Sequence, residues 1–128
     1  MLINKKYCFE IILCIFLAGC SKKQDTGDKI APVITITSPS NNQHFTAGQT
    51  INTTASATDN DKVTELHIHV INKTTGELLR DIHSYPDQQS GTVQDSFAAE
   101  AGIIYTIQII AKDPAQNLAT AKVEVSVN

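Results

Sequence analysis

Residues 105–112 read YTIQIIAK, and in this stretch apolar side chains occupy every second position. A period of two is typical of a β-strand with one buried face, because successive side chains of a strand point to opposite faces of the sheet. The intervening positions carry Thr106, Gln108 and Lys112, together with one isoleucine. The pattern therefore predicts a strand whose buried face is made of Tyr105, Ile107, Ile109 and Ala111.

A similar alternation recurs in six further stretches, which are separated by turn residues such as Gly, Pro, Asn and Asp. These stretches are residues 33–37, 50–58, 63–71, 78–85, 92–98 and 120–127. No part of this region has the 3.6-residue period of an amphipathic helix. Seven short strands without helices predict an all-β fold, and specifically a seven-stranded antiparallel β-sandwich.

Three parts of the chain resemble bacterial immunoglobulin-like (Ig-like) domains. They are PVITITSP at 32–39, the pair AGQTI and ASATD at 47–51 and 55–59, and the ending that runs from AGIIYT at 101–106 to AKDPAQN at 111–117. The resemblance spans residues 32–128 and implies an Ig-like or fibronectin-like sandwich. The chain lacks the core tryptophan of antibody-type domains, so the kinship is with bacterial and fibronectin-like modules. In such sandwiches a tyrosine hydroxyl bonds back to the backbone, and the resemblance gives this role to Tyr105.

The sequence LAGC at 17–20 ends a short apolar run that begins after Lys5 and Lys6, and this arrangement resembles a bacterial lipoprotein signal. The resemblance implies cleavage before Cys20, acylation of its sulfur with diacylglycerol, and a further acyl chain such as palmitate on the new amino group. A membrane-spanning helix needs about 20 apolar residues. The run from Tyr7 to Leu17 is shorter, so we expect a signal peptide rather than a transmembrane helix.

The chain divides into three parts under this interpretation. Residues 1–19 are the signal peptide, residues 20–31 are the acylated cysteine and a flexible tether, and residues 32–128 are the sandwich domain. The tether is polar and charged, as disordered spacers are. We expect a lipid-anchored protein of the bacterial cell envelope, and the serine after the cysteine resembles the sorting signal of outer-membrane lipoproteins. Periplasmic and surface-exposed display both stay open.

Composition and motifs limit the classes of function. The chain has 10 Lys and Arg against 13 Asp and Glu, a formal net charge of −3, so it lacks the basic face that nucleic acid binding requires. Cys8 and Cys14 lie in the expected signal peptide, which leaves Cys20 without a disulfide partner in the same mature chain. None of the nucleophile, phosphate-binding or zinc-helix motifs of enzymes is present, so we do not expect an enzyme.

A histidine pair is the first candidate site. His67 and His69 stand two apart on an expected strand, so both imidazoles project from one face, as does the carboxylate of Glu65. Nitrogen and oxygen ligands of this kind suit zinc or copper. The same pattern resembles domains of unknown function in Bacteroidota lipoproteins, which carry His-x-His on the corresponding strand.

The following strand would extend this candidate metal site. If the hairpin turns about Thr74, Asp81 lies opposite His67, and His83 lies opposite Glu65 as a third imidazole. A shift of the register by one residue would move both to the other face of the sheet. A plain solvent-facing strand surface is therefore the competing interpretation of these histidines.

A second candidate site is a calcium site in two loops. Asp59 and Asp61 follow one expected strand, and Asp113 and Asn117 follow another. In a sandwich these two loops lie toward the same end, and calcium takes six to eight oxygen ligands. Asp and Asn are also ordinary turn residues, because their side chains bond to nearby backbone, and the full acidic spacing of a calcium loop is missing.

The sequence predicts a lipid-anchored Ig-like binding or adhesion module with no required cofactor, whose ligand is an envelope protein or glycan. One alternative is an envelope protein that binds zinc or copper, or less favourably calcium. Another alternative is an accessory domain for glycan or peptide recognition. That alternative would need an exposed aromatic platform, for which the expected domain offers only Phe45, Tyr85, Phe97 and Tyr105.

Overall fold

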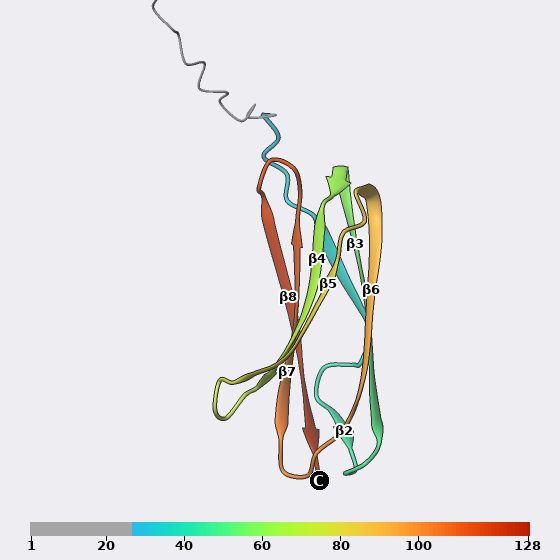
Figure 1. Ribbon diagram of the computed structural model, residues 1–128, viewed down its shortest axis with the longest axis vertical. Coiled ribbons are helices and arrows are strands. Elements are labelled where there is room, and N and C mark those ends of the chain that lie inside the picture. Colours follow the sequence, from blue (N-terminus) through green and yellow to red (C-terminus); the bar gives the residue numbers. More distant parts are fainter. Residues whose placement is uncertain (1–26) are drawn as a thin grey trace, which may run out of the picture.

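The computed structural model describes residues 27–128, which form eight strands and no helix. The predicted signal peptide and Cys20 lie outside the described residues. The strands follow one another along the body shown in Figure 1 as β1 (Val33–Ser38), β2 (Gln43–Phe45), β3 (Thr50–Val63), β4 (Glu65–Asn72), β5 (Leu78–Ser84), β6 (Gln88–Ala98), β7 (Ile104–Lys112) and β8 (Leu118–Val127).

The strands form two sheets, with the orders β1-β3-β6 and β2-β8-β7-β4-β5. Every pair of neighbours is antiparallel except β2 and β8, which run parallel. The predicted all-β sandwich is confirmed, and the structure adds β2 as an eighth strand. Sequence periodicity misses β2 because three residues are too few to display an alternation, and its hydrogen bonds come from the distant strand β8.

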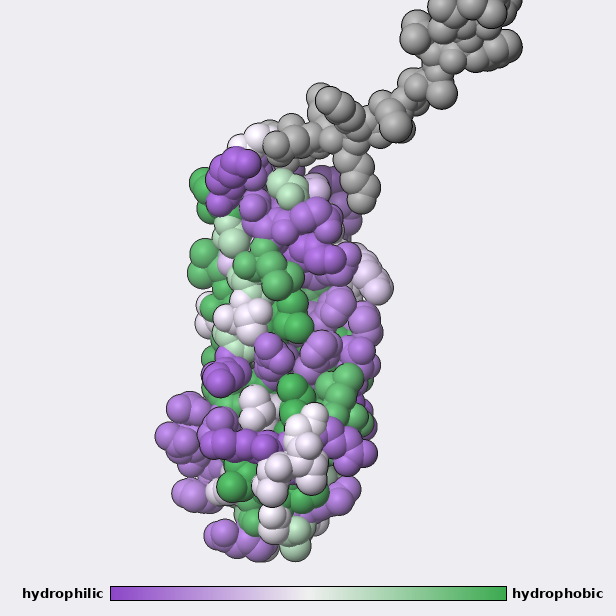
Figure 2. Space-filling view, turned by 90° about the vertical axis from the view of Figure 1, so that its left-hand side faces the viewer, coloured by the Kyte–Doolittle hydropathy of each residue, from purple (hydrophilic) through white to green (hydrophobic). Residues whose placement is uncertain are grey.

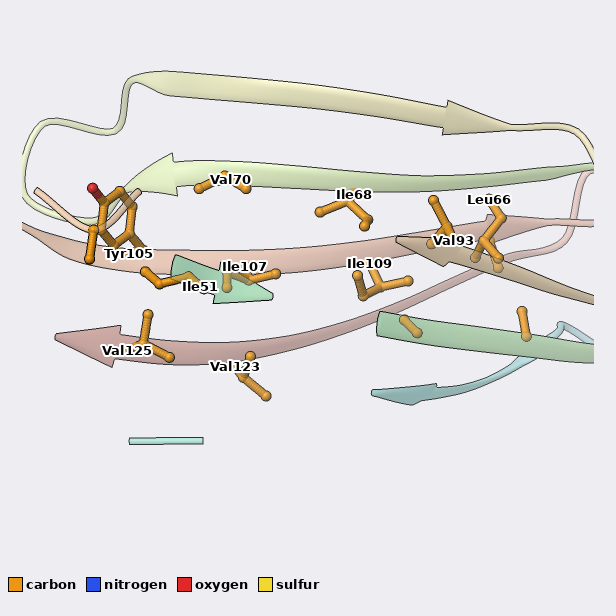
Figure 3. Packing of buried hydrophobic residues seen from close by; sticks show 14 of the residues in the cluster. Ile51, Leu66, Ile68, Val70, Val93, Tyr105, Ile107, Ile109, Val123 and Val125 are labelled. Carbon is orange, nitrogen blue, oxygen red and sulfur yellow. The ribbon is translucent and has the colours of Figure 1, made fainter. Parts of the chain in front are cut away.

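The core lies between the sheets and follows the alternation of the strands. Ile107 and Ile109 of β7 are fully buried, as are Leu66 and Ile68 on the neighbouring β4. From the opposite sheet, Ile51 and other side chains of β3 and β6 complete the same cluster. Figure 3 shows these side chains spread along β4 and β7, with Ile51 next to Ile107. The buried face predicted for residues 105–112 is therefore confirmed.

Tyr105 closes one end of the core. Its ring is buried and packs edge-on against Phe97, with 5.2 Å between the ring centroids. Its hydroxyl accepts a hydrogen bond of 3.1 Å from the backbone N–H of Glu100. This contact satisfies the polar atom of a buried tyrosine and ties β7 to the loop before it, as the sequence comparison with Ig-like sandwiches implied.

An ion pair links the two sheets at one edge. Arg80 of β5 donates from Nε and from a terminal nitrogen to the two carboxylate oxygens of Asp95 on β6, at 2.6 and 2.7 Å. The Asp95 side chain is only 7% exposed, and the guanidinium carbon of Arg80 lies 5.7 Å from the centre of the Phe97 ring. A two-pronged pair of this kind fixes geometry as well as charge.

The surface of the body is mixed in character. Figure 2 shows hydrophilic and hydrophobic side chains interspersed along one face of the elongated domain. Within residues 27–128, no helix has the length and apolar character needed to cross a membrane.

The core packing leads to a first prediction. Ile107→Ala and Val123→Ala should each lower the free energy of unfolding by about 1–4 kcal/mol, because each removes buried methyl groups and leaves a cavity. Gln108→Ala and Lys122→Ala, on the outer faces of the same two strands, should change it little. Urea titration of the four variants measures this, and equal losses for the inner and outer pairs would contradict the strand assignment.

The ion pair between the sheets leads to a second prediction. At neutral pH, Arg80→Met should lower the free energy of unfolding by about 1–3 kcal/mol, because the buried Asp95 carboxylate loses its partner.

The pH dependence of the difference in unfolding free energy between wild type and Arg80→Met provides a control for this prediction. The hydrogen bonds from Arg80 lower the pKa of Asp95 from its ordinary value of 3.8. A lowered folded-state pKa gives stability that is present above the unfolded-state value and is lost as pH falls through the folded one. The difference between wild type and Arg80→Met should therefore shrink below pH 3.8. A difference that stays constant in urea titrations across this range would contradict the role of the pair.

Candidate functional site

The outer face of the β4–β5 hairpin gathers the predicted metal ligands. On β4 the side chains of Leu66, Ile68 and Val70 are fully buried, so the residues between them point outward. Antiparallel pairing places β5 directly beside this strand. We define the histidine surface as the outward side chains Glu65, His67, His69, Asp81 and His83.

The register across this hairpin differs from the expected one. His67 lies opposite His83, and His69 lies opposite Asp81, so each partner on β5 is displaced by two residues from its predicted position. A displacement of two keeps every side chain on the same face, because the side-chain period of a strand is two. The prediction that these groups share one face is therefore confirmed, whereas the predicted pairing of Asp81 with His67 and of His83 with Glu65 is wrong.

Local turn chemistry explains the displacement. The Asn72 side-chain oxygen accepts hydrogen bonds from the backbone N–H groups of Thr74 and Thr75, at 3.0 and 3.3 Å. Gly76 has a φ of +75°, which glycine adopts without strain. A bulge between the pairs Val70–Arg80 and Ile71–Leu78 also adds one residue to β5. The chain therefore does not turn symmetrically about Thr74.

Three groups of the histidine surface meet at one point. The rings of His67 and His83 have centroids 4.0 Å apart, and the Nε2 atom of His83 lies 2.9 Å from Oδ1 of Asp81. One nitrogen or oxygen atom from each of His67, Asp81 and His83 lies within 4.8 Å of the other two. This trio offers two imidazole nitrogens and one carboxylate oxygen to a shared position above the sheet.

The other two members of the surface lie beside this trio. His69 contacts the same oxygen of Asp81, with its Nε2 atom at 3.2 Å. One carboxylate oxygen of Glu65 makes two contacts. It lies 3.6 Å from Nε2 of His67 and 3.0 Å from Nζ of Lys112. The lysine neutralises the carboxylate, and neither Glu65 nor His69 is part of the closest group of ligand atoms.

Burial keeps the His67 imidazole neutral. Its side chain is 16% exposed, and its Nε2 atom is buried without a hydrogen bond partner. Burial lowers the pKa of His67 below 6.5, and repulsion from His83 lowers it further. A hydrogen bond from His83 lowers the pKa of Asp81. At neutral pH the surface therefore presents an uncharged imidazole next to a carboxylate, the forms that bind a metal ion.

The residues of the calcium hypothesis come together in part, but Asp59 and Asp61 lie within β3 and not in a loop after it, because the strand runs on to Val63 instead of ending at residue 58. Carboxylate oxygens of Asp59 and Asp113 lie within 4.8 Å of each other and of an oxygen of Asp28. Asp61 is not part of this group, and its backbone N–H donates to Asp59 at 2.9 Å. Asp59 and Asp113 therefore converge as predicted, although Asp59 belongs to the irregular end of β3, and they are joined by Asp28, which the sequence assigned to the tether.

Amide groups occupy much of this acidic cluster. Asn117 points its side-chain nitrogen, rather than its oxygen, at a carboxylate oxygen of the fully buried Asp113, 2.7 Å away. The same nitrogen donates to the backbone oxygen of Asp28, whose carboxylate accepts from Asn60. In this arrangement Asn117 donates hydrogen bonds to both carboxylate oxygens of Asp113 and holds the start of the described chain against the sandwich.

Aromatic side chains do not form an exposed platform in residues 27–128. Tyr105 is buried, Phe45 and Phe97 are half-buried, and only Tyr85 is largely exposed, at 67%. Tyr85 lies next to the histidine surface, with its hydroxyl 3.4 Å from Nδ1 of His83. The exposed aromatic platform that glycan recognition would require therefore consists of the Tyr85 ring alone in the described residues.

Comparison with known proteins agrees with the fold. Residues 32–85 match the profile of the bacterial Ig domain family. A search of curated proteins gives no match. Together with the two-sheet architecture, the family match supports an Ig-like domain, and this class of domain is typical of binding and adhesion modules.

Solved structures with the same architecture are distant in sequence. Fibronectin(III)-like modules of Clostridium thermocellum CbhA are 21% identical with a TM-score of 0.54, over 76% of this chain and 46% of that one. The chain thus spans about half the length of that structure. A superoxide reductase from Ignicoccus hospitalis is 13% identical with a TM-score of 0.56, over 83% and 91% of the two chains. The sulfur carrier protein SoxY from Chlorobium limicola is 15% identical with a TM-score of 0.54, over 74% and 78%. At these identities the similarity shows the fold alone.

The electrostatics of the histidine surface lead to a third prediction. In the metal-free chain, His67 should titrate below its ordinary pKa of 6.5. In His83→Gln the pKa of His67 should rise, because the repulsion from a second imidazolium is removed. Nuclear magnetic resonance titration of the imidazole protons, with a chelator present, measures both values. A pKa of His67 above 6.5 in the wild-type chain would contradict the effect of burial and of repulsion from His83 on this imidazole.

Proposed function

We propose that this chain is a lipid-anchored, Ig-like binding module of the bacterial cell envelope, which acts by binding rather than by catalysis. The histidine surface is its ligand-binding site. The proposal rests on the Ig-like sandwich of residues 32–128, which the fold and the family match support, and on an N-terminal sequence that resembles a lipoprotein signal.

The observation that carries the binding site is the polar atom left without a partner on the outer face of β4. Buried polar atoms are almost always hydrogen-bonded, because leaving one unpaired costs free energy. Nε2 of His67 is buried without a hydrogen bond partner beside two other imidazoles and two carboxylates. A surface that served only to be solvated would not need this concentration of mutually close ionisable groups.

The anchor would be Cys20, and residues 21–31 would connect it to the sandwich. Two or more acyl chains hold a protein firmly to a bilayer, at about 0.8 kcal/mol for each buried CH₂. The contacts of Asn117 with the backbone oxygens of Asp28 and Ile30 support a tether that joins the sandwich at the end where Asp59 lies. The serine at position 21 favours the outer membrane.

The anchor leads to a fourth prediction. In the wild-type chain expressed in a Gram-negative host, Cys20 should carry lipid, and the protein should be found in the detergent phase of a Triton X-114 partition. Cys20→Ser should leave an unprocessed precursor or release the chain from the membrane fraction. Mass spectrometry of the N-terminal peptide identifies the acyl groups.

Matched controls are available within the same segment. Cys8→Ser and Cys14→Ser alter cysteines that the proposal places in the removed signal peptide, so both variants should be processed and lipidated as the wild type is. Processing and membrane retention of Cys20→Ser at the wild-type level would overturn the anchored function.

A further inference from the structure

We propose that the histidine surface binds one transition metal ion, Zn²⁺ or Cu²⁺, through His67, Asp81 and His83. The inference rests on the proposed function in that it uses the same surface, and it names the class of ligand. It does not require the lipid anchor.

The donor set has the chemistry that these metals select. Imidazole nitrogen suits zinc and copper, and a carboxylate oxygen commonly completes a site with two histidines. Because ligand atoms lie about 2.0–2.2 Å from zinc, two ligands of one ion are at most about 4.4 Å apart. The ligand atoms of the trio already lie within 4.8 Å of one another in the described structure. Small side-chain rotations are enough to close the remaining distance.

The backbone holds the two histidines in place before any ion arrives. His67 and His83 are directly opposite each other on hydrogen-bonded strands, and β4 is also paired with β7 on its other side. A site on regular, paired strands needs no loop to become ordered, so less conformational entropy is lost on binding. This geometry differs from a chelate formed by His67 and His69 along one strand, because their ring centroids are 6.2 Å apart against 4.0 Å for the cross-strand pair.

Neighbouring groups would orient the ligands. Nδ1 of His83 lies 3.4 Å from the Tyr85 hydroxyl, which leaves Nε2, next to Asp81, to face the ion. His69 contacts Asp81 at 3.2 Å and would act as a positioning residue for the carboxylate. Such outer contacts fix the orientation of metal ligands and tune affinity.

The site is open on its outer side. The side chains of Asp81 and His83 are 39% and 40% exposed, whereas His67 lies deeper against the sheet. Three protein ligands on one side of an ion leave a position for water or for a donor from another molecule. The geometry therefore suits reversible capture of an ion from the surroundings rather than a closed structural metal site.

Calorimetric titration of the full chain tests the inference. The chain is purified without a histidine tag in a mild detergent, its free thiols are alkylated, and ZnCl₂ and CuCl₂ are titrated in separate experiments. We expect one ion per chain. His67→Gln, Asp81→Asn and His83→Gln should each weaken binding by more than about 100-fold, since loss of an outer contact alone typically costs about 10–100-fold.

Two control variants sharpen the test. His44→Gln removes the remaining histidine of the chain, which lies on β2 in contact with Ser126, and should keep the wild-type affinity. His69→Gln should weaken binding less than His83→Gln does, and the reverse order would overturn the cross-strand site. Circular dichroism of each variant shows whether it is folded, and electron paramagnetic resonance of the Cu²⁺ form should show coupling to two nitrogen ligands.

The outcomes separate this inference from the proposed function. Wild-type binding no tighter than that of His83→Gln would overturn the metal site and leave the anchored binding module standing. Metal binding as expected, together with a chain that partitions into the aqueous phase, would overturn the anchor and leave the metal site standing.

Discussion

The pairing of β4 between β7 and β5 is the constraint on which the rest of the structure depends. Leu66, Ile68 and Val70 must enter the core, because each fills space between the two sheets without exposure to water. The side chains between them must then point away from the core, so His67 and His69 both lie on the outer face of the sheet. Core packing and the position of the histidine surface are therefore two results of one alternation.

The sequence could predict faces better than it could predict neighbours. The alternation of residues 105–112 was enough to assign the buried face of β7, whereas His83 was placed on the outer face of β5 by assuming where the hairpin turns. The exact partners across the hairpin depended on the hydrogen bonds of Asn72 and on a bulge, and neither has a periodic signal. The apolar pattern of a strand therefore indicates which face each residue lies on, whereas turn geometry decides which residues of two neighbouring strands pair.

The acidic cluster shows the same division between topology and local detail. That Asp59 and Asp113 converge followed from the order of strands in a sandwich, since the end of β3 and the loop after β7 belong to one end. The membership of Asp28 could not be foreseen, because a polar segment carries no pattern that distinguishes a docked chain from a spacer. The orientation of Asn117, as a donor rather than an oxygen ligand, is likewise settled only by its neighbours in space.

The hydrogen bonds of Asn117 with the backbone of Asp28 and Ile30 have a consequence for how the molecule would stand on a membrane. They hold the incoming chain at one tip of the elongated body, and the C-terminal residue lies at the opposite tip in Figure 1. An anchored molecule would therefore be attached to the membrane at that tip, and its opposite tip would be free to point away from the bilayer. The β4–β5 hairpin would then form part of its flank, so an approaching ligand would travel sideways between neighbouring molecules instead of descending from above. Crowding of such molecules in the bilayer would therefore restrict access, independently of the affinity of any single molecule.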